Sequence, residues 1–154
     1  TLFSLNGRDC TCGQKGCFEA YTSVTALIKD TKEILKDYPN SILYEMTDND
    51  LSKINGKMIC EAYQKKDEAA TKAFDRYVMF LSEGLLSFMN IFRMDAILLG
   101  GGLAESGETL LGPVREYCEK RNYGFGKAPK VEIQKATLGN KAGILGAASL
   151  LFES

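Results

Sequence analysis

The longest helical pattern in the sequence lies between Asp67 and Phe92, and it implies a large apolar surface to pack against. Apolar residues recur at helical spacing along it and form one broad stripe, which comprises Phe74, Tyr77, Val78, Leu81, Leu85, Phe88, Met89 and Phe92. A stripe of this width is typical of a helix that packs against a sheet. The apolar run 96–99 follows almost directly and predicts a strand buried on both faces.

Shorter patterns on both sides of this helix give the order of the remaining elements. We expect helices over 18–35, 57–65 and 142–152, a short helix opened by Asp48, a helix capped by Ser106, and a strand within 130–137. Strands that alternate with helices predict an α/β domain built in layers. Such sheets bind ligands at the carboxyl ends of their strands, so the glycines at 100–102 lie where a ligand site is expected.

Composition narrows the class of protein. The 154 residues suit one compact domain, and nineteen basic against twenty acidic side chains leave a net charge of −1. This balance argues against a domain that holds nucleic acid mainly by electrostatic attraction. The sequence contains no apolar run long enough to cross a bilayer, no signal peptide, and no cysteine pattern typical of secreted disulfide frameworks. We therefore expect a cytoplasmic protein with no membrane partner. Its start, TLFSLNGRDC, predicts a processed end or a segment of a longer chain.

Three closely spaced cysteines form the first candidate site. Cys10, Cys12 and Cys17 lie in the segment CTCGQKGCFE, where Gly13 and Gly16 allow a tight backbone. Three thiols this close can converge on one metal ion, and zinc is the best candidate because it prefers thiolate ligands. A loop with incidental cysteines, or a local disulfide between two of them, remains an alternative.

This segment resembles the CxCGxxGCxE motif of the ROK family (repressors, open reading frames, kinases), and every fixed position of that motif is present. In the family, the three cysteines and an upstream histidine hold a structural zinc. The present sequence contains no histidine, and the family's histidine would fall just before Thr1. Water or another protein group could supply the fourth ligand. Residues 1–17 are therefore expected to form a zinc loop.

The motif ends at Glu19, two residues after the last cysteine. A carboxylate at the start of a helix is favoured by the helix dipole, which is a sufficient structural reason for its presence. The resemblance implies a second role, because the matching glutamate of ROK kinases hydrogen-bonds hydroxyls of the bound sugar. A rigid metal loop beside it would hold such a carboxylate in place.

A glycine run forms the second candidate site. Gly100, Gly101 and Gly102 let backbone amides approach a phosphate or a nucleoside without a side-chain clash, although a plain turn is the commoner reason for such a run. The segment is neither a Walker loop nor a Rossmann fingerprint. It resembles the segment of ROK and actin-like kinases that contacts the adenosine part of ATP. Small residues within 138–151 indicate a closely packed helix, and Lys141 stands where family members often carry an acid.

The resemblance implies a two-lobed protein of the actin and hexokinase type. Residues 1–154 would be the carboxy-terminal, ribonuclease H-like lobe, with a mixed sheet and flanking helices. The implied reaction is ATP-dependent phosphorylation of a hexose or an N-acetylated hexosamine with Mg²⁺, in a protein that forms a homodimer. The family places the catalytic aspartate and the first phosphate loop in the other lobe, so we assign no catalytic residue and expect this chain alone to be inactive. We interpret Asp30, Asp37, Asp67 and Asp75 as solvated helix faces.

Two further functions are open. A ROK transcriptional repressor would use the same lobe to sense a sugar, and it would bind nucleic acid only through an amino-terminal DNA-binding domain. A zinc-dependent structural or dimerisation module would bind neither sugar nor ATP.

Overall fold

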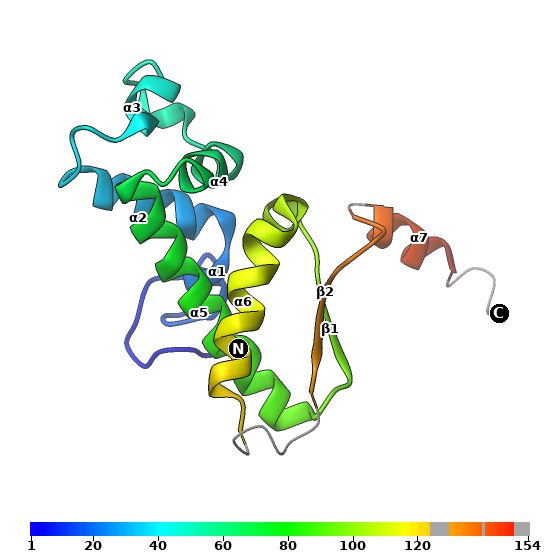
Figure 1. Cartoon of the computed structure of the whole chain (residues 1–154). Coiled ribbons are helices and arrows are strands. Elements are labelled where there is room, and N and C mark those ends of the chain that lie inside the picture. The colour runs from blue at the N-terminus through cyan, green and yellow to red at the C-terminus, as the bar shows by residue number, and fades with distance from the viewer. Residues whose placement is uncertain (124–129, 140, 150–154) are drawn as a thin grey trace.

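A computed structural model describes residues 1–123, 130–139 and 141–149 of the chain (Figure 1). The α-helices are α1 (Glu19–Thr22), α2 (Val24–Leu35), α3 (Ile42–Met46), α4 (Gly56–Gln64), α5 (Glu68–Phe92), α6 (Glu108–Arg121) and α7 (Lys141–Ser149). Two 3-10 turns, η1 (Leu51–Lys53) and η2 (Gly102–Ser106), and two strands, β1 (Ala96–Leu99) and β2 (Glu132–Lys135), complete these elements.

The core lies around α5, the long helix that the apolar stripe predicts. This helix packs against α2, α4 and α6 and places Phe74 in a fully buried position. Leu35 of α2, Ile59 of α4 and Val114 of α6 are also fully buried. Asp67 begins α5 as its N-cap, since its side chain accepts a hydrogen bond from the Ala70 backbone. The prediction that this helix packs against a sheet is wrong, because its main neighbours are other helices. Phe92, the last residue of the predicted stripe, is exposed.

The two strands form a parallel sheet, with Ala96 opposite Glu132 and Leu99 opposite Lys135. Helix α6 connects them and packs on β2, which gives the β-α-β arrangement expected of an α/β domain. Antiparallel pairing in the described residues is limited to isolated bridges near the amino terminus. The prediction that 96–99 is buried on both faces is wrong. Ala96 and Leu98 are exposed, and Leu98 retains 63% of its accessible surface, because the described helices cover the other face of the strand.

The predicted helix over 18–35 is broken at Ser23. This residue adopts an extended conformation (φ −77°, ψ 158°), and its hydroxyl accepts a hydrogen bond from the Ala26 backbone, so it ends α1 and caps α2. The apolar spacing continues across the break, which is why periodicity alone does not reveal it. The predicted helix over 57–65 is confirmed as α4, with Asn55 as its cap.

Two expected helix starts are wrong. Asp48 opens no helix, because its φ of 53° is left-handed and it lies just after the end of α3. The cap of α3 is Ser41. Ser106 does not cap α6, because its hydroxyl donates to the Leu103 carbonyl and Gly107 precedes the helix. The predicted last helix is confirmed as α7 up to Ser149, and residues 150–152 of that prediction lie outside the described residues.

None of the helices in the described ranges combines the length and apolar character needed to cross a bilayer.

Candidate functional site

Backbone hydrogen bonds fold residues 8–17, which we call the cysteine loop, into a tight knuckle. Asp9 and Lys15 form an antiparallel bridge, and the Cys10 backbone N–H donates to the Gln14 carbonyl at 2.9 Å. The Gly16 N–H donates to the Arg8 carbonyl at 2.7 Å and closes the base of the knuckle. The loop is therefore held in shape by its own main chain.

Gly16 is the position where this shape demands glycine. Its φ is +75°, a conformation that other residues rarely adopt, and an added Cβ would overlap the Ser4 carbonyl. Gly13 also has a positive φ, of +84°, but a Cβ there would meet nothing within 4 Å. Gly13 is therefore favoured only by its positive φ. At Gly16 the absence of a side chain also allows the amino-terminal segment to pack against the loop.

The knuckle brings the three predicted ligand atoms together. The Sγ atoms of Cys10, Cys12 and Cys17 all lie within 4.8 Å of one another, and those of Cys12 and Cys17 are 3.6 Å apart. All five cysteines are free, so the alternative of a local disulfide is not what the structure contains. Two sulfurs on one tetrahedral zinc are about 3.8 Å apart, given zinc–sulfur bonds of about 2.3 Å. The three thiols are therefore close enough together to converge on one zinc ion.

The pKa values of the Cys12 and Cys17 thiols shift in opposite directions. Hydrogen bonds from the Gln14 backbone and from the neighbouring thiols lower the pKa of Cys12. The hydrogen bond with Cys12, together with desolvation, raises the pKa of Cys17 to about 11. A bound metal would remove the remaining protons, because thiols coordinate metals as thiolates.

The amino-terminal segment lies beside the third cysteine. Leu2 pairs with Cys17 in an antiparallel bridge, and the Phe18 N–H donates to the Thr1 carbonyl at 2.9 Å. Within the described ranges, the cluster of potential metal ligands contains only the three cysteines, and the whole sequence contains no histidine. Thr1 and Leu2 thus lie against the main chain of Cys17 and Phe18.

Glu19 is the first residue of α1, and it is exposed. The preceding residue, Phe18, fixes its place. The Phe18 ring stacks edge-on against Phe88 with centroids 5.6 Å apart, and it fills the space that a side chain at Gly84 would occupy. The carboxylate is therefore accessible to a ligand, while its backbone is held against α5.

The glycine turn, Gly100–Gly102, follows the carboxyl end of β1 and lines a cavity of about 270 Å³. Thr22, Ser23 and Val24, at the break between α1 and α2, also line this cavity. Gly101 has a φ of +96°, and added Cβ atoms at Gly101 and Gly102 would meet nothing within 4 Å. The structure thus brings the predicted nucleotide segment beside the helix that begins with Glu19, with its main chain accessible.

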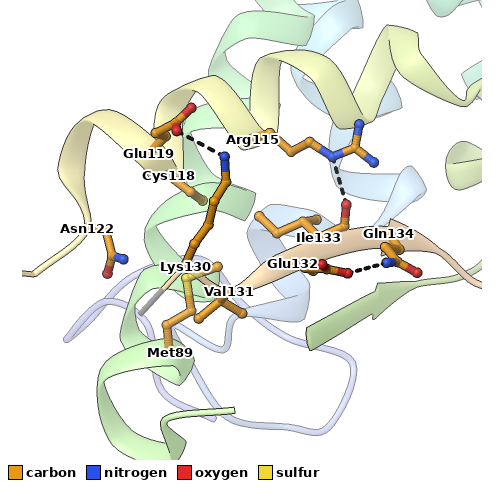
Figure 2. Close-up of a pocket in the computed structure, with 10 residues that line it drawn as sticks. All are labelled: Met89, Arg115, Cys118, Glu119, Asn122, Lys130, Val131, Glu132, Ile133 and Gln134. Atoms are coloured by element: carbon orange, nitrogen blue, oxygen red, sulfur yellow. Dashed lines mark hydrogen bonds and ion pairs between the residues drawn. The ribbon is translucent and has the colours of Figure 1, made fainter. Parts of the chain in front are cut away.

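A larger cavity of about 460 Å³ lies between α5, α6 and β2 (Figure 2). Its charged side chains are already paired. The Arg115 Nε donates to the Ile133 carbonyl at 2.7 Å, and Lys130 lies 3.1 Å from Glu119. Burial raises the pKa of Cys118, in its wall, to about 11. None of the predicted site residues lines this cavity.

Two of the four aspartates interpreted as solvated faces have structural roles instead, so that interpretation is wrong for them. Asp30 is half-buried and forms an ion pair with Arg8, with 2.9 Å between oxygen and nitrogen. Asp67 accepts hydrogen bonds from Ser41 and Ile42 and so joins α3 to the start of α5. Asp37 and Asp75 are exposed, as expected. Sequence reasoning missed Arg8, because no local pattern indicates a partner 22 positions away.

Comparison with known proteins agrees with these features. The whole chain, residues 1–154, matches the ROK family. The chain belongs to the ROK family. A glucokinase from Thermotoga maritima is 34% identical over 152 residues, which cover 96% of this chain and 46% of the relative. A xylose repressor from Bacillus spizizenii is 30% identical over 152 residues, which cover 97% of this chain and 34% of that repressor.

Solved structures of ROK proteins share its architecture. A ROK family glucokinase from Streptomyces griseus, in complex with glucose and AMPPNP, matches with a TM-score of 0.89 and 32% identity over 97% of this chain and 49% of its own. A ROK hexokinase from Thermus thermophilus matches with a TM-score of 0.66 and 27% identity, over 96% and 46%. The predicted α/β, actin/hexokinase-like fold class is confirmed. The chain spans about half the length of the glucokinases that it matches.

Proposed function

We propose that this chain is the carboxy-terminal lobe, residues 1–154, of a two-lobed sugar kinase. The kinase transfers a phosphoryl group from ATP to a hexose or an N-acetylated hexosamine. The observation that carries this proposal is the likeness to the Streptomyces griseus glucokinase. It extends over 97% of the chain, and that protein was solved with glucose and an ATP analogue.

Three groups of residues would contribute to the site. Cys10, Cys12 and Cys17 would hold a structural zinc, which their mutual distances support. Glu19 would accept hydrogen bonds from sugar hydroxyls, because its exposed carboxylate stands on a helix that is fixed against α5. The main chain of Gly100, Gly101 and Gly102 would contact the nucleotide, which carries Mg²⁺ on its phosphates. The shared cavity with the α1–α2 break supports this assignment.

The transfer step itself would depend on the other lobe. A general base must take the proton from the attacking sugar hydroxyl, and the resemblance places that aspartate outside this chain. We therefore assign binding roles, and no catalytic residue, to residues 1–154. A cytoplasmic homodimer is the assembly that the family resemblance favours.

A second candidate function is that of a sugar-sensing lobe in a transcriptional repressor. The xylose repressors among the relatives favour it, since their matches cover 97% of this chain, as much as the match to the Thermotoga maritima glucokinase, which covers 96%. In that protein, an amino-terminal DNA-binding domain would lie upstream of the sugar-sensing lobe. Sugar binding through Glu19 would be common to both functions.

The decisive experiment measures ATP-dependent phosphorylation of glucose and of N-acetylglucosamine by the full-length protein. We expect the protein to phosphorylate one of these sugars, and we expect substitution of Glu19 to raise the KM for that sugar. Glu19→Gln should raise the KM for the sugar about tenfold to a hundredfold, because a hydrogen bond to a charged group contributes about 1.5–3 kcal/mol. The matched control is Glu68→Gln, since Glu68 is likewise an exposed acid at the first position of a helix.

The outcomes separate the candidate functions. Sugar binding without any phosphoryl transfer would support the repressor. Calorimetric titrations that detect neither sugar nor ATP would refute both and leave a structural module. An unchanged KM for Glu19→Gln would remove Glu19 from the sugar site.

A further inference from the structure

Arg8 stands at the base of the cysteine loop and is the most enclosed cation near it. Its side chain retains 22% of its accessible surface, and its partner Asp30 in α2 retains 14%. One guanidinium nitrogen donates to Asp30 at 2.9 Å, and another donates to the Ala20 carbonyl in α1 at 3.3 Å. The guanidinium also lies over the Tyr21 ring, 4.5 Å from its centroid. One side chain thus contacts two helices at once.

The main chain of Arg8 adds two more links. Its N–H donates to the Tyr21 hydroxyl at 3.0 Å, and its carbonyl accepts from the Gly16 N–H at 2.7 Å. Arg8 therefore joins both ends of the loop to α1. In the part of the chain that the structure describes, every hydrogen bond between residues 5–16 and helices α1 or α2 involves Arg8.

Cys17, at the end of the loop, accepts one further hydrogen bond from the Ala20 N–H in α1 at 3.0 Å, and the other attachments lead to the amino-terminal segment. The N–H groups of Phe3 and Ser4 both donate to the Gly16 carbonyl, at 2.7 and 3.0 Å. That segment packs against α1 and α5 through the Phe3 ring, whose centroid lies 5.2 Å from that of Tyr21 and 5.9 Å from that of Phe80. The fork of donors on Arg8 adds directional polar contacts to this apolar packing, because a guanidinium is planar and always charged and holds several acceptors in fixed directions.

We propose that Arg8 is a positioning residue that fixes the thiol cluster and Glu19 relative to α2 and α5. This inference rests on the proposed zinc and sugar roles of those residues. Arg8 touches neither the thiols nor the sugar acid. It acts through Ala20 and Tyr21, which directly follow Glu19, and through Gly16, which directly precedes Cys17. Loss of the guanidinium would leave both groups intact but allow their relative geometry to vary.

The test compares Arg8→Ala with Arg76→Ala in the full-length protein. Arg76 is a matched control because it approaches the same Asp30 at 3.9 Å and the same Phe80 ring at 5.7 Å, and both of these residues lie outside the cysteine loop. We expect Arg8→Ala to weaken Zn²⁺ affinity, measured by competition with a chelator, about 10- to 100-fold. The KM for the sugar should rise by a similar factor, while the KM for ATP, which depends on the separate glycine turn, stays unchanged. Arg76→Ala should leave all three quantities unchanged.

Asp30→Asn provides a milder variant in case Arg8→Ala does not fold. It removes the charge that holds the guanidinium and should shift the Zn²⁺ affinity and the sugar KM in the same direction by a smaller factor. Wild-type Zn²⁺ affinity and sugar KM in both variants would overturn the inference, as would equal increases in the KM values for sugar and ATP. A wild-type protein that binds neither Zn²⁺ nor sugar would instead refute the proposed function.

Discussion

The cysteine loop and the glycine turn both depend on glycine, but they are built in opposite ways. In the loop, buried Gly16 lies against the Ser4 carbonyl, and main-chain hydrogen bonds close the knuckle around it. In the turn, Gly101 and Gly102 are exposed, and side chains added there would meet no atom within 4 Å. One glycine is required by the packing of the protein itself, whereas the other two leave space that the described residues do not fill.

This difference indicates that the glycine of the cysteine loop has a structural role, whereas the glycine turn leaves its main chain accessible to a ligand. A segment shaped by its own contacts should lose stability when it is altered. A segment that is open toward solvent should tolerate alteration until its ligand is added. The following predictions test this contrast.

Removal of metal from the loop should have the largest effect. A metal that binds only the folded protein stabilises it by about 4 kcal/mol when its concentration is about 1,000 times its Kd. We therefore expect a chelator to lower the free energy of unfolding of the wild-type protein, measured by urea denaturation, by an amount of that order. The triple variant Cys10→Ser, Cys12→Ser, Cys17→Ser should not respond to the chelator, and a response of equal size there would place the metal elsewhere.

The Zn²⁺ affinity of the proposed metal site should decrease as the pH is lowered. The thiol of Cys17, whose pKa is raised to about 11, is protonated in the metal-free protein at neutral pH, and metal binding must release that proton. Affinity for Zn²⁺ should therefore fall as pH falls, by about tenfold per pH unit for each proton released. Isothermal titrations in buffers of different ionisation enthalpy would count the released protons, and a count of zero would contradict thiolate ligation.

Gly16→Ala should have the next largest effect on stability. It combines an unfavourable positive φ with overlap of the Ser4 carbonyl, and we expect a loss of about 1–3 kcal/mol in the free energy of unfolding. Gly13→Ala is the matched control, because it carries the positive φ without the overlap and should cost less. Equal losses at the two positions would show that the contact with Ser4 contributes nothing.

The glycine turn should show the smallest effect on stability. Gly102 has open space around it, so Gly102→Ala should change the free energy of unfolding by less than about 0.5 kcal/mol. If the nucleotide approaches this main chain, the same substitution should raise the KM for ATP and leave the KM for the sugar unchanged. Steady-state kinetics with each substrate varied in turn would measure both values, and an unchanged KM for ATP would exclude contact at this position.

Features that depend on residues close together in the sequence could be predicted from the spacing of those residues. The long helix α5, the short strand β1 and the convergence of three thiols all follow from spacing within a few residues, and the structure confirms each of them. The break at Ser23 was missed because apolar residues continue in helical register on both sides of it. Periodicity reports which face is buried, and a single capping residue can interrupt the helix without changing that face.

Features that depend on distant partners were not predictable. The ion pair between Arg8 and Asp30 spans 22 positions, and nothing near either residue distinguishes it from the surface charges around it. The exposure of Leu98 was missed for a related reason. An apolar run indicates that a strand can be buried on both faces, but the sequence of this chain alone does not show which segment would cover the second face.

If Glu19 binds a sugar as proposed, the Phe18 ring, which occupies the space beside Gly84, limits how the sugar preference could change. Any side chain at position 84 would overlap the ring, and a displaced ring would carry the adjoining acid with it. The acid is thus anchored to the middle of a helix of 25 residues, most of whose inward-facing side chains belong to the core. Evolution can change the selectivity of such a site more readily through other segments that surround the ligand than by moving this acid.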